Sequence, residues 1–106
     1  PGENVVDRDK AITAKFIKFL NHRDPSKPFF SFLFYDSVHS YCKTQGLTEK
    51  FSPIITTCNR SSHVKHVEPY LNRYKNALAF VDNQIQLDIQ TLQKLGLMDD
   101  TIIIIT

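Results

Sequence analysis

The feature that most constrains the fold is the C-terminal third of the chain, where a long amphipathic stretch leads into a bare apolar run. Apolar residues recur every three or four positions between Pro69 and Leu95, a spacing typical of one helical face. Pro69 suits a first helical turn, and Gly96 suits the left-handed position that ends a helix. Residues 101–106 read TIIIIT, which is typical of a buried strand. The sequence therefore predicts a helix over 69–95 and a strand over 101–106.

The long helix is expected to pack on a sheet rather than to form a coiled coil, because its apolar stripe spans fewer than four clean heptads. The stripe is interrupted at Asp88. Its expected members are Leu71, Tyr74, Leu78, Val81, Ile85, Leu92 and Leu95.

The N-terminal part of the chain shows the same order of elements. A first helix is expected at about 8–21, with Asp7 or Asp9 as its N-cap. Residues 29–35 read FFSFLFY, and this short apolar run after a proline favours a strand over a buried helix. Residues 40–68 show no sustained period, and an irregular segment of that length is usually functional or mobile.

Together these elements predict an α/β fold, namely a partial βαβ slice of a larger, mainly parallel sheet with flanking helices. The strand–crossover–strand unit should be right-handed, with 29–35 and 101–106 parallel and adjacent. A length of 106 residues permits one domain at most, so 1–106 is interpreted as a single partial domain. Because exposed apolar strand edges recruit other strands, the chain is expected to self-associate, to swap elements, or to need the rest of a parent domain.

Composition narrows the function classes. The chain is 42% hydrophobic and 23% charged, as is ordinary for a soluble globular protein. Its net charge is only +2, and its basic residues are scattered, which argues against a nucleic-acid partner. No apolar stretch approaches the roughly 20 residues of a membrane span, so the chain itself is expected to be soluble.

His39 and Asp36 are the candidate substrate-binding residues. His39 lies just past the carboxyl end of the 29–35 run, where parallel sheets present ligand-binding groups. An imidazolium donates hydrogen bonds to sulfate or phosphate oxygens, and a neutral imidazole binds metals. Asp36 can hydrogen-bond to His39 or to a loop amide. The structural alternatives are a histidine that only caps the strand and a carboxylate that only stabilises a turn.

The two cysteines leave two possibilities open. Cys42 and Cys58 can form a disulfide in an oxidising compartment, or they can remain free thiols. A zinc site formed with His63 and His66 is disfavoured, because structural zinc sites use closely spaced cysteine pairs and a wider histidine spacing. No catalytic residue and no metal ligand is assigned within the chain.

These segments resemble the sulfatases and their relatives in the alkaline-phosphatase superfamily, including the phosphoglycerol transferases. One match is the helix and strand at the C-terminal end, and a second is PFFSFLFYDSVHSY at residues 28–41. Within the family, FLFYDSVHSY looks closest to sulfatase-like inner-membrane proteins of Gram-negative bacteria, whose globular domain faces the periplasm. The matching positions of the first segment are Tyr74, Leu78, Asp82, Ile85, Gly96, Leu97, Asp99, Asp100, Thr101 and Ile102 to Ile105.

The resemblance implies a fragment of a domain that hydrolyses or transfers sulfate or phosphate esters, with His39 contacting the anionic ester. In the family a metal-binding Asp-His pair follows the strand that 101–106 resembles, and a Ser, Thr or formylglycine nucleophile lies elsewhere. Both are outside the chain, which is therefore expected to be inactive alone and to hold no cofactor. The intact domain would use a divalent metal (Ca, Mg, Mn or Zn).

The implied partners are the remainder of the parent domain and a sulfate or phosphate ester or lipid headgroup. The implied location is the periplasmic face of the inner membrane. An alternative is a catalytically reduced inner-membrane protein that senses lipid or regulates the envelope. A small α/β interaction domain with accidental similarity is the remaining alternative.

Overall fold

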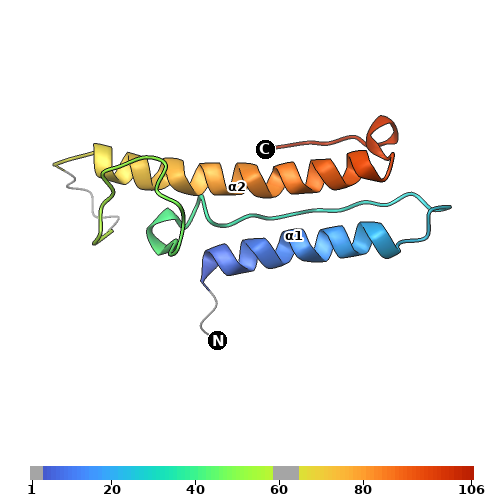
Figure 1. Cartoon of the computed structure of the whole chain (residues 1–106), viewed down its shortest axis with the longest axis horizontal. Helices are drawn as coiled ribbons and strands as arrows, with labels where there is room; N and C mark the ends of the chain where they lie inside the picture. Colours follow the sequence, from blue (N-terminus) through green and yellow to red (C-terminus); the bar gives the residue numbers. More distant parts are fainter. Residues whose placement is uncertain (1–3, 59–64) are drawn as a thin grey trace.

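The computed structural model describes residues 4–58 and 65–106, and all of the regular secondary structure in these residues is helical. The two long helices are α1 (Val5–His22) and α2 (Glu68–Lys94), and they lie side by side and run in the same direction (Figure 1). Two short 3₁₀ helices, η1 (Tyr41–Lys43) and η2 (Met98–Asp100), complete the order α1–η1–α2–η2.

The first helix begins earlier than its sequence pattern predicts. Asn4 is the N-cap, and its side-chain oxygen accepts a hydrogen bond from the backbone N–H of Asp7 at 3.0 Å. At the other end the N–H of Arg23 donates to the carbonyl of Phe19, and the backbone then becomes extended. The helix itself is confirmed, but the prediction of Asp7 or Asp9 as its N-cap is wrong.

The second helix ends where the glycine predicts. Gly96 has a φ of +68°, a conformation that favours glycine. Its N–H donates to the carbonyl of Gln93 at 3.0 Å, and the N–H of Leu97 donates to the carbonyl of Leu92 at 2.9 Å. These two bonds form a Schellman motif, which turns the chain back along α2.

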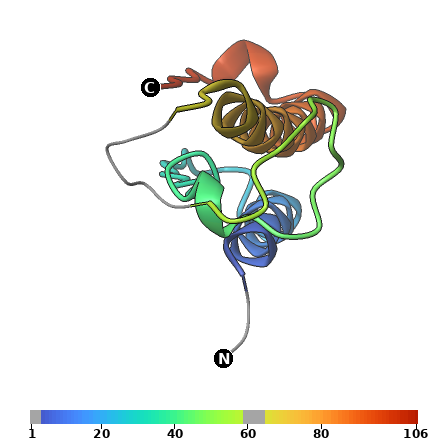
Figure 2. The same ribbon diagram turned by 90° about the vertical axis from the view of Figure 1, so that its left-hand side faces the viewer.

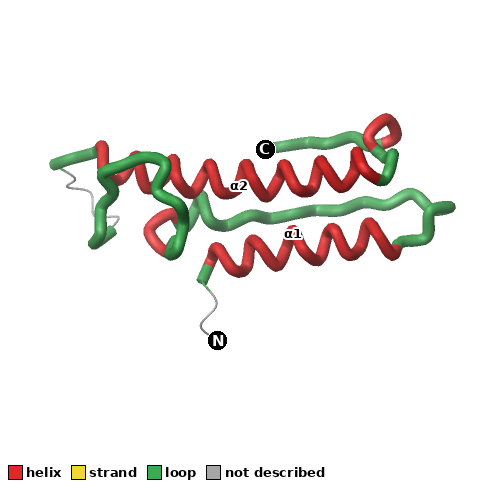
Figure 3. Tube along the Cα trace, in the orientation of Figure 1, coloured by secondary structure: helices red, strands yellow, loops and turns green. Residues whose placement is uncertain are grey.

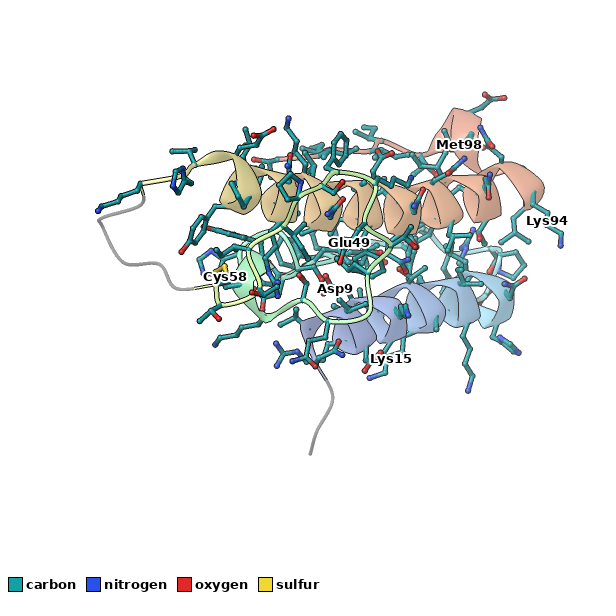
Figure 4. The ribbon with its side chains drawn as sticks, turned by 60° about the vertical axis from the view of Figure 1, so that its left-hand side comes forward. Asp9, Lys15, Glu49, Cys58, Lys94 and Met98 are labelled. Carbon is teal, nitrogen blue, oxygen red and sulfur yellow. A yellow bond between two sulfur atoms is a disulfide. The ribbon has the colours of Figure 1, made fainter. Side chains whose placement is uncertain are left out.

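The main hydrophobic cluster lies between the C-terminal halves of α1 and α2, while Val5, Val6, Ala77 and Val81 are buried outside it. The buried members of the cluster are Phe16, Leu20 and Leu92. The partly buried residues packed against them are Phe29, Leu33, Leu97 and Met98, the last of which is labelled in Figure 4. The extended run 29–35 lies along the two helices, on one side of the pair (Figures 1 and 2).

The predicted α/β fold, with its βαβ slice of a parallel sheet, is wrong. Residues 29–35 and 101–106 are extended in the chain trace, yet no described residue belongs to a strand (Figure 3). Among the described residues, no backbone hydrogen bond joins the two runs. Periodicity predicts an extended backbone, but a strand also needs a neighbour that completes its hydrogen-bond ladder. Here alternate side chains of 29–35 pack on the helices instead, and the ladder is missing.

The buried face of α2 also differs from the expected apolar stripe. Leu71, Tyr74, Leu78 and Leu95 are exposed. Polar residues take part of the buried face, because the chain that packs there offers backbone groups as well as apolar side chains. The buried residues of α2 are Asn72, Asn76, Ala77, Val81, Gln84, Asp88 and Leu92. In the described part of the chain, neither long helix is long and apolar enough to cross a membrane.

Candidate functional site

His39 lies in a tight turn that follows the extended run 29–35, and it is exposed. The backbone N–H of Ser40 donates to the carbonyl of Asp36 at 2.8 Å, and the N–H of Lys43 donates to the carbonyl of Ser40 at 2.7 Å. The turn therefore continues directly into η1. His39 therefore lies within the turn that the hydrogen bond between Ser40 and Asp36 closes.

A buried carboxylate on α1 fixes the start of this turn. Asp9 is fully buried, and its two oxygens accept hydrogen bonds from the backbone N–H groups of Asp36 at 3.0 Å and Ser37 at 2.9 Å. Figure 4 shows Asp9 on the side of α1 that faces the rest of the molecule. Hydrogen bonds from N–H groups to a carboxylate are stronger than those between neutral groups. Asp9 thus positions the turn that carries His39.

Asp36 is engaged within the same turn. Its Oδ2 accepts a hydrogen bond from the hydroxyl of Ser40 at 3.0 Å and lies 3.4 Å from a guanidinium nitrogen of Arg8. The pair with Arg8 is partly exposed, and such pairs add at most about 1 kcal/mol to stability. The two candidate residues are therefore close in the chain, with Asp36 bonded to the turn and His39 presented at the surface.

A buried polar cluster lies next to the turn and joins both helices. The hydroxyl of Tyr35 donates to Oδ2 of Asp88 at 2.6 Å, and the hydroxyl of Thr13 lies 2.8 Å from the Tyr35 oxygen. Burial raises the pKa of the Asp88 carboxyl, while the bond from Tyr35 opposes this. Burial and the bond to Asp88 raise the pKa of Tyr35. Asp88 interrupts the apolar stripe of α2 because it is the buried acceptor for Tyr35.

Cys42 and Cys58 form a disulfide, which resolves the choice that the sequence left open. Their sulfur atoms are bonded, and their Cα atoms lie 5.2 Å apart. Cys58 lies beside η1 in Figure 4. Both thiols are used, so neither cysteine is a metal ligand or a nucleophile in this structure. Of the histidines considered with them, His66 is exposed and His63 lies outside the described residues.

Arg73 on α2 holds the loop that follows η1. Its guanidinium donates to the carbonyls of Tyr41 and Ile55, each at 3.0 Å. It also donates to the carbonyls of Cys42 at 3.2 Å and Thr44 at 2.9 Å. A guanidinium has five N–H donors in a planar fork, so it can bind several carbonyls at once. One side chain therefore joins both ends of the disulfide loop to α2.

Two asparagines on α2 complete this attachment. The side chain of Asn76 both donates to the carbonyl and accepts from the N–H of Phe51, each at 2.9 Å. The amide of Asn72 donates to the carbonyl of Pro53 at 3.0 Å. Sequence reasoning missed Asn72, Arg73 and Asn76 because it followed apolar spacing. The available signal was a set of polar side chains at helical spacing beside the irregular segment.

The described residues give no metal centre. No three His, Cys, Asp or Glu side chains in residues 4–58 and 65–106 gather in a way that could hold an ion. The chemistry that these residues offer is recognition, through an exposed imidazole on a turn that also carries Ser40 and lies next to Arg8. Imidazolium, guanidinium and hydroxyl groups all donate hydrogen bonds to anionic oxygens.

Comparison with known proteins identifies the family. The family model described as Sulfatase matches residues 4–106, which is nearly the whole chain and includes the turn with His39. Neither the curated proteins nor the solved structures gave a match. The match confirms the sulfatase part of the resemblance and leaves its inner-membrane and lipid-sensing details without support. The chain belongs to the sulfatase family.

Proposed function

We propose that this chain is the part of a sulfatase-family domain that presents His39 to an anionic sulfate or phosphate ester. The observation that carries this proposal is the place of His39, exposed on a turn that buried and bonded groups hold in shape. A protonated imidazole donates hydrogen bonds to ester oxygens and balances their negative charge.

Asp36 supports the site by positioning the turn. Its carboxylate accepts a hydrogen bond from Ser40 and pairs with Arg8. A carboxylate would repel an anionic ester rather than bind it. The same pairing keeps the guanidinium of Arg8 near the turn, where its charge favours an anion. Asp36 thus belongs to the proposed site as a residue that acts through its neighbours.

Hydrolysis needs groups beyond the described ones. The chain lacks the Cys-x-Pro-x-Arg sequence from which sulfatases make their nucleophile, and its described residues bring no metal ligands together. We assign the nucleophile and the divalent metal to other parts of a larger domain, so the chain alone should bind esters without hydrolysing them. When bound, such a metal would stabilise the charge that develops on the ester.

The disulfide supports an oxidising compartment as the working place of the protein. Structural disulfides persist in the bacterial periplasm and in secreted proteins, and they are rare in the cytosol. The bond between Cys42 and Cys58 closes the loop beside the proposed site. We therefore propose that the domain works in an oxidising compartment, and the resemblance favours the periplasmic face of the inner membrane.

The test is an NMR titration of the isotope-labelled protein with inorganic sulfate and, separately, with phenyl phosphate. The imidazole resonances of each histidine report binding. We expect saturable shifts at His39, whereas His22 on the exposed end of α1 should stay unchanged. His39→Asn should abolish saturation, and the matched variant His22→Asn should preserve it. Equal shifts at both histidines, or none at His39, would contradict the proposal.

A further inference from the structure

The side chain of Asp36 holds two hydrogen-bond donors close to His39 in the fold. Its Oδ2 accepts a hydrogen bond from the hydroxyl of Ser40 at 3.0 Å, and the same oxygen lies 3.4 Å from Nη2 of Arg8. Hydroxyl and guanidinium groups are also the donors that proteins use for phosphate oxygens. A carboxylate oxygen of the chain is thus held by the two kinds of group that would hold an oxygen of an anionic ester.

The shape of the turn does not depend on the charge of Asp36. The backbone N–H of Asp36 donates to Asp9 at 3.0 Å, and the backbone carbonyl of Asp36 accepts from the N–H of Ser40 at 2.8 Å. Both bonds are made by the main chain, so they are independent of the side chain at this position. An asparagine would also keep the bond from the Ser40 hydroxyl, because its amide oxygen is an acceptor. The negative charge of Asp36 is therefore available for another role.

The guanidinium of Arg8 is held only weakly. Its side chain is 55% exposed, against 27% for that of Asp36, and the described residues provide no other acceptor for it. Exposed ion pairs of this kind contribute little to stability, because water competes for both charges. A guanidinium released from such a pair can bind a phosphate-like anion through two parallel hydrogen bonds. Arg8 is therefore a donor that an anion can recruit at little cost.

We propose that Asp36 is an internal competitor of the ester, whose carboxylate holds Arg8 and Ser40 until an oxyanion of the ester displaces it. This inference rests on the proposed role of His39 and extends it, since Arg8 becomes a second cationic group that binds the ester. An anion that reaches only one of the two donors leaves the other on Asp36. The competition therefore favours an anion with several oxygens around one centre, as in a sulfate or phosphate ester.

The test measures the dissociation constant of phenyl phosphate by NMR, from the resonances of the His39 imidazole and of the Arg8 Nε–H group. Asp36→Asn should tighten binding about fivefold, because the ester no longer has to displace an ion pair. Asp7→Asn is the matched control, because it removes the same charge from an exposed residue next to Arg8 in the sequence. Exposed charges are largely screened, so this control should change the constant by less than about twofold.

A double variant tests whether Asp36 acts through Arg8. Arg8→Gln should weaken binding of phenyl phosphate about fivefold, because the ester loses a cationic donor. In that background the carboxylate has no guanidinium to hold, so adding Asp36→Asn should tighten binding by no more than about twofold. A full fivefold gain there would show that Asp36 only repels the ester, and it would overturn the competition. Equal gains from Asp7→Asn and Asp36→Asn, or no gain from Asp36→Asn, would overturn it as well.

The two resonances separate this inference from the proposed role of His39. Saturable shifts of both, with one dissociation constant, support the two together. A shift at His39 alone would preserve the proposed function and overturn the competition. A shift at Arg8 alone, with the expected gain in Asp36→Asn, would preserve the competition and overturn the role of His39. The absence of a saturable shift at either residue would contradict both. Because neither Arg8 nor Asp36 is buried, circular dichroism of the variants should match that of the unmodified protein.

Discussion

The two halves of α2 hold their neighbours by different physical means. The first half binds the loop after η1 through polar side chains, namely Asn72, Arg73 and Asn76. The second half contributes Leu92 to an apolar core with α1. Apolar packing is non-directional, whereas hydrogen bonds to loop carbonyls require each group in its place. The C-terminal half of α2 therefore stabilises the fold, and its N-terminal half holds the shape of the loop that follows the candidate site.

The largest expected effect lies in the apolar half. Leu92→Ala should lower the free energy of unfolding by about 2–5 kcal/mol, because it opens a cavity between α1 and α2. Urea denaturation measures the change. Leu87→Ala, on the exposed surface of the same helix, should cost less than about 1 kcal/mol. If Leu92→Ala and Leu87→Ala are equally stable, the side chain of Leu92 is not buried in the core.

The next effect belongs to the disulfide beside the polar half. Replacing Cys42 and Cys58 together by serine should lower stability by about 3 kcal/mol, since a loop of this length then gains freedom in the unfolded chain. Urea denaturation with and without a reductant checks this. The reductant should destabilise the parent protein and leave the serine variant unchanged. If full reduction leaves the free energy of unfolding of the parent protein unchanged, the disulfide does not stabilise it.

A smaller effect is expected when the clamp on the loop is removed. Arg73→Met keeps a long side chain but loses four hydrogen bonds to carbonyls, at a cost of about 2 kcal/mol. Gln86→Met is the matched control, because Gln86 is exposed on the same helix. Thermal unfolding should separate the two variants. Indistinguishable transitions would mean that the disulfide alone holds the loop.

The smallest effect concerns pH, at the buried carboxyl of Asp88 in the C-terminal half of α2. Burial raises the pKa of Asp88 above its ordinary value of 3.8, so folding favours the protonated form. Its contribution to stability is therefore full at pH values below 3.8 and is lost as pH rises through the higher folded pKa. Asp88→Asn should remove this loss, whereas the exposed Asp82→Asn should retain it. A parent and an Asp88→Asn variant with parallel pH profiles would contradict the assignment.

The sequence predicts the helices well, because their signals are local. Spacing places both long helices within a few residues, although the predicted N-cap of α1 was wrong, and Gly96 marks the end of α2. The sheet was wrong because an apolar run such as 29–35 fixes an extended backbone without showing which neighbour completes a ladder. The packing of α2 was wrong for a related reason. Asn72 and Asn76 are buried against backbone groups of the loop, and Asp88 is buried against Tyr35, contacts that the spacing of apolar residues does not show.

For the candidate site, too, local features could be predicted from the sequence and long-range contacts could not. The place of His39 after an apolar run is visible in the sequence, and so is the family to which its surroundings belong. The groups that shape the turn are not visible, because Asp9 lies 27 and 28 residues away from the amides that it binds. A buried carboxylate on a helix looks like a cap or a surface charge until its distant partners are known.

The most direct test of the central claim, that polar side chains of α2 order the loop, is amide hydrogen exchange at Phe51 in Asn76→Ala. Asn76 binds both backbone groups of Phe51, so the variant should lose about tenfold protection there. The exposed Asn83→Ala should show no change, and the amide of Leu20 should keep its protection in both variants. Unchanged exchange at Phe51 in Asn76→Ala would contradict the account.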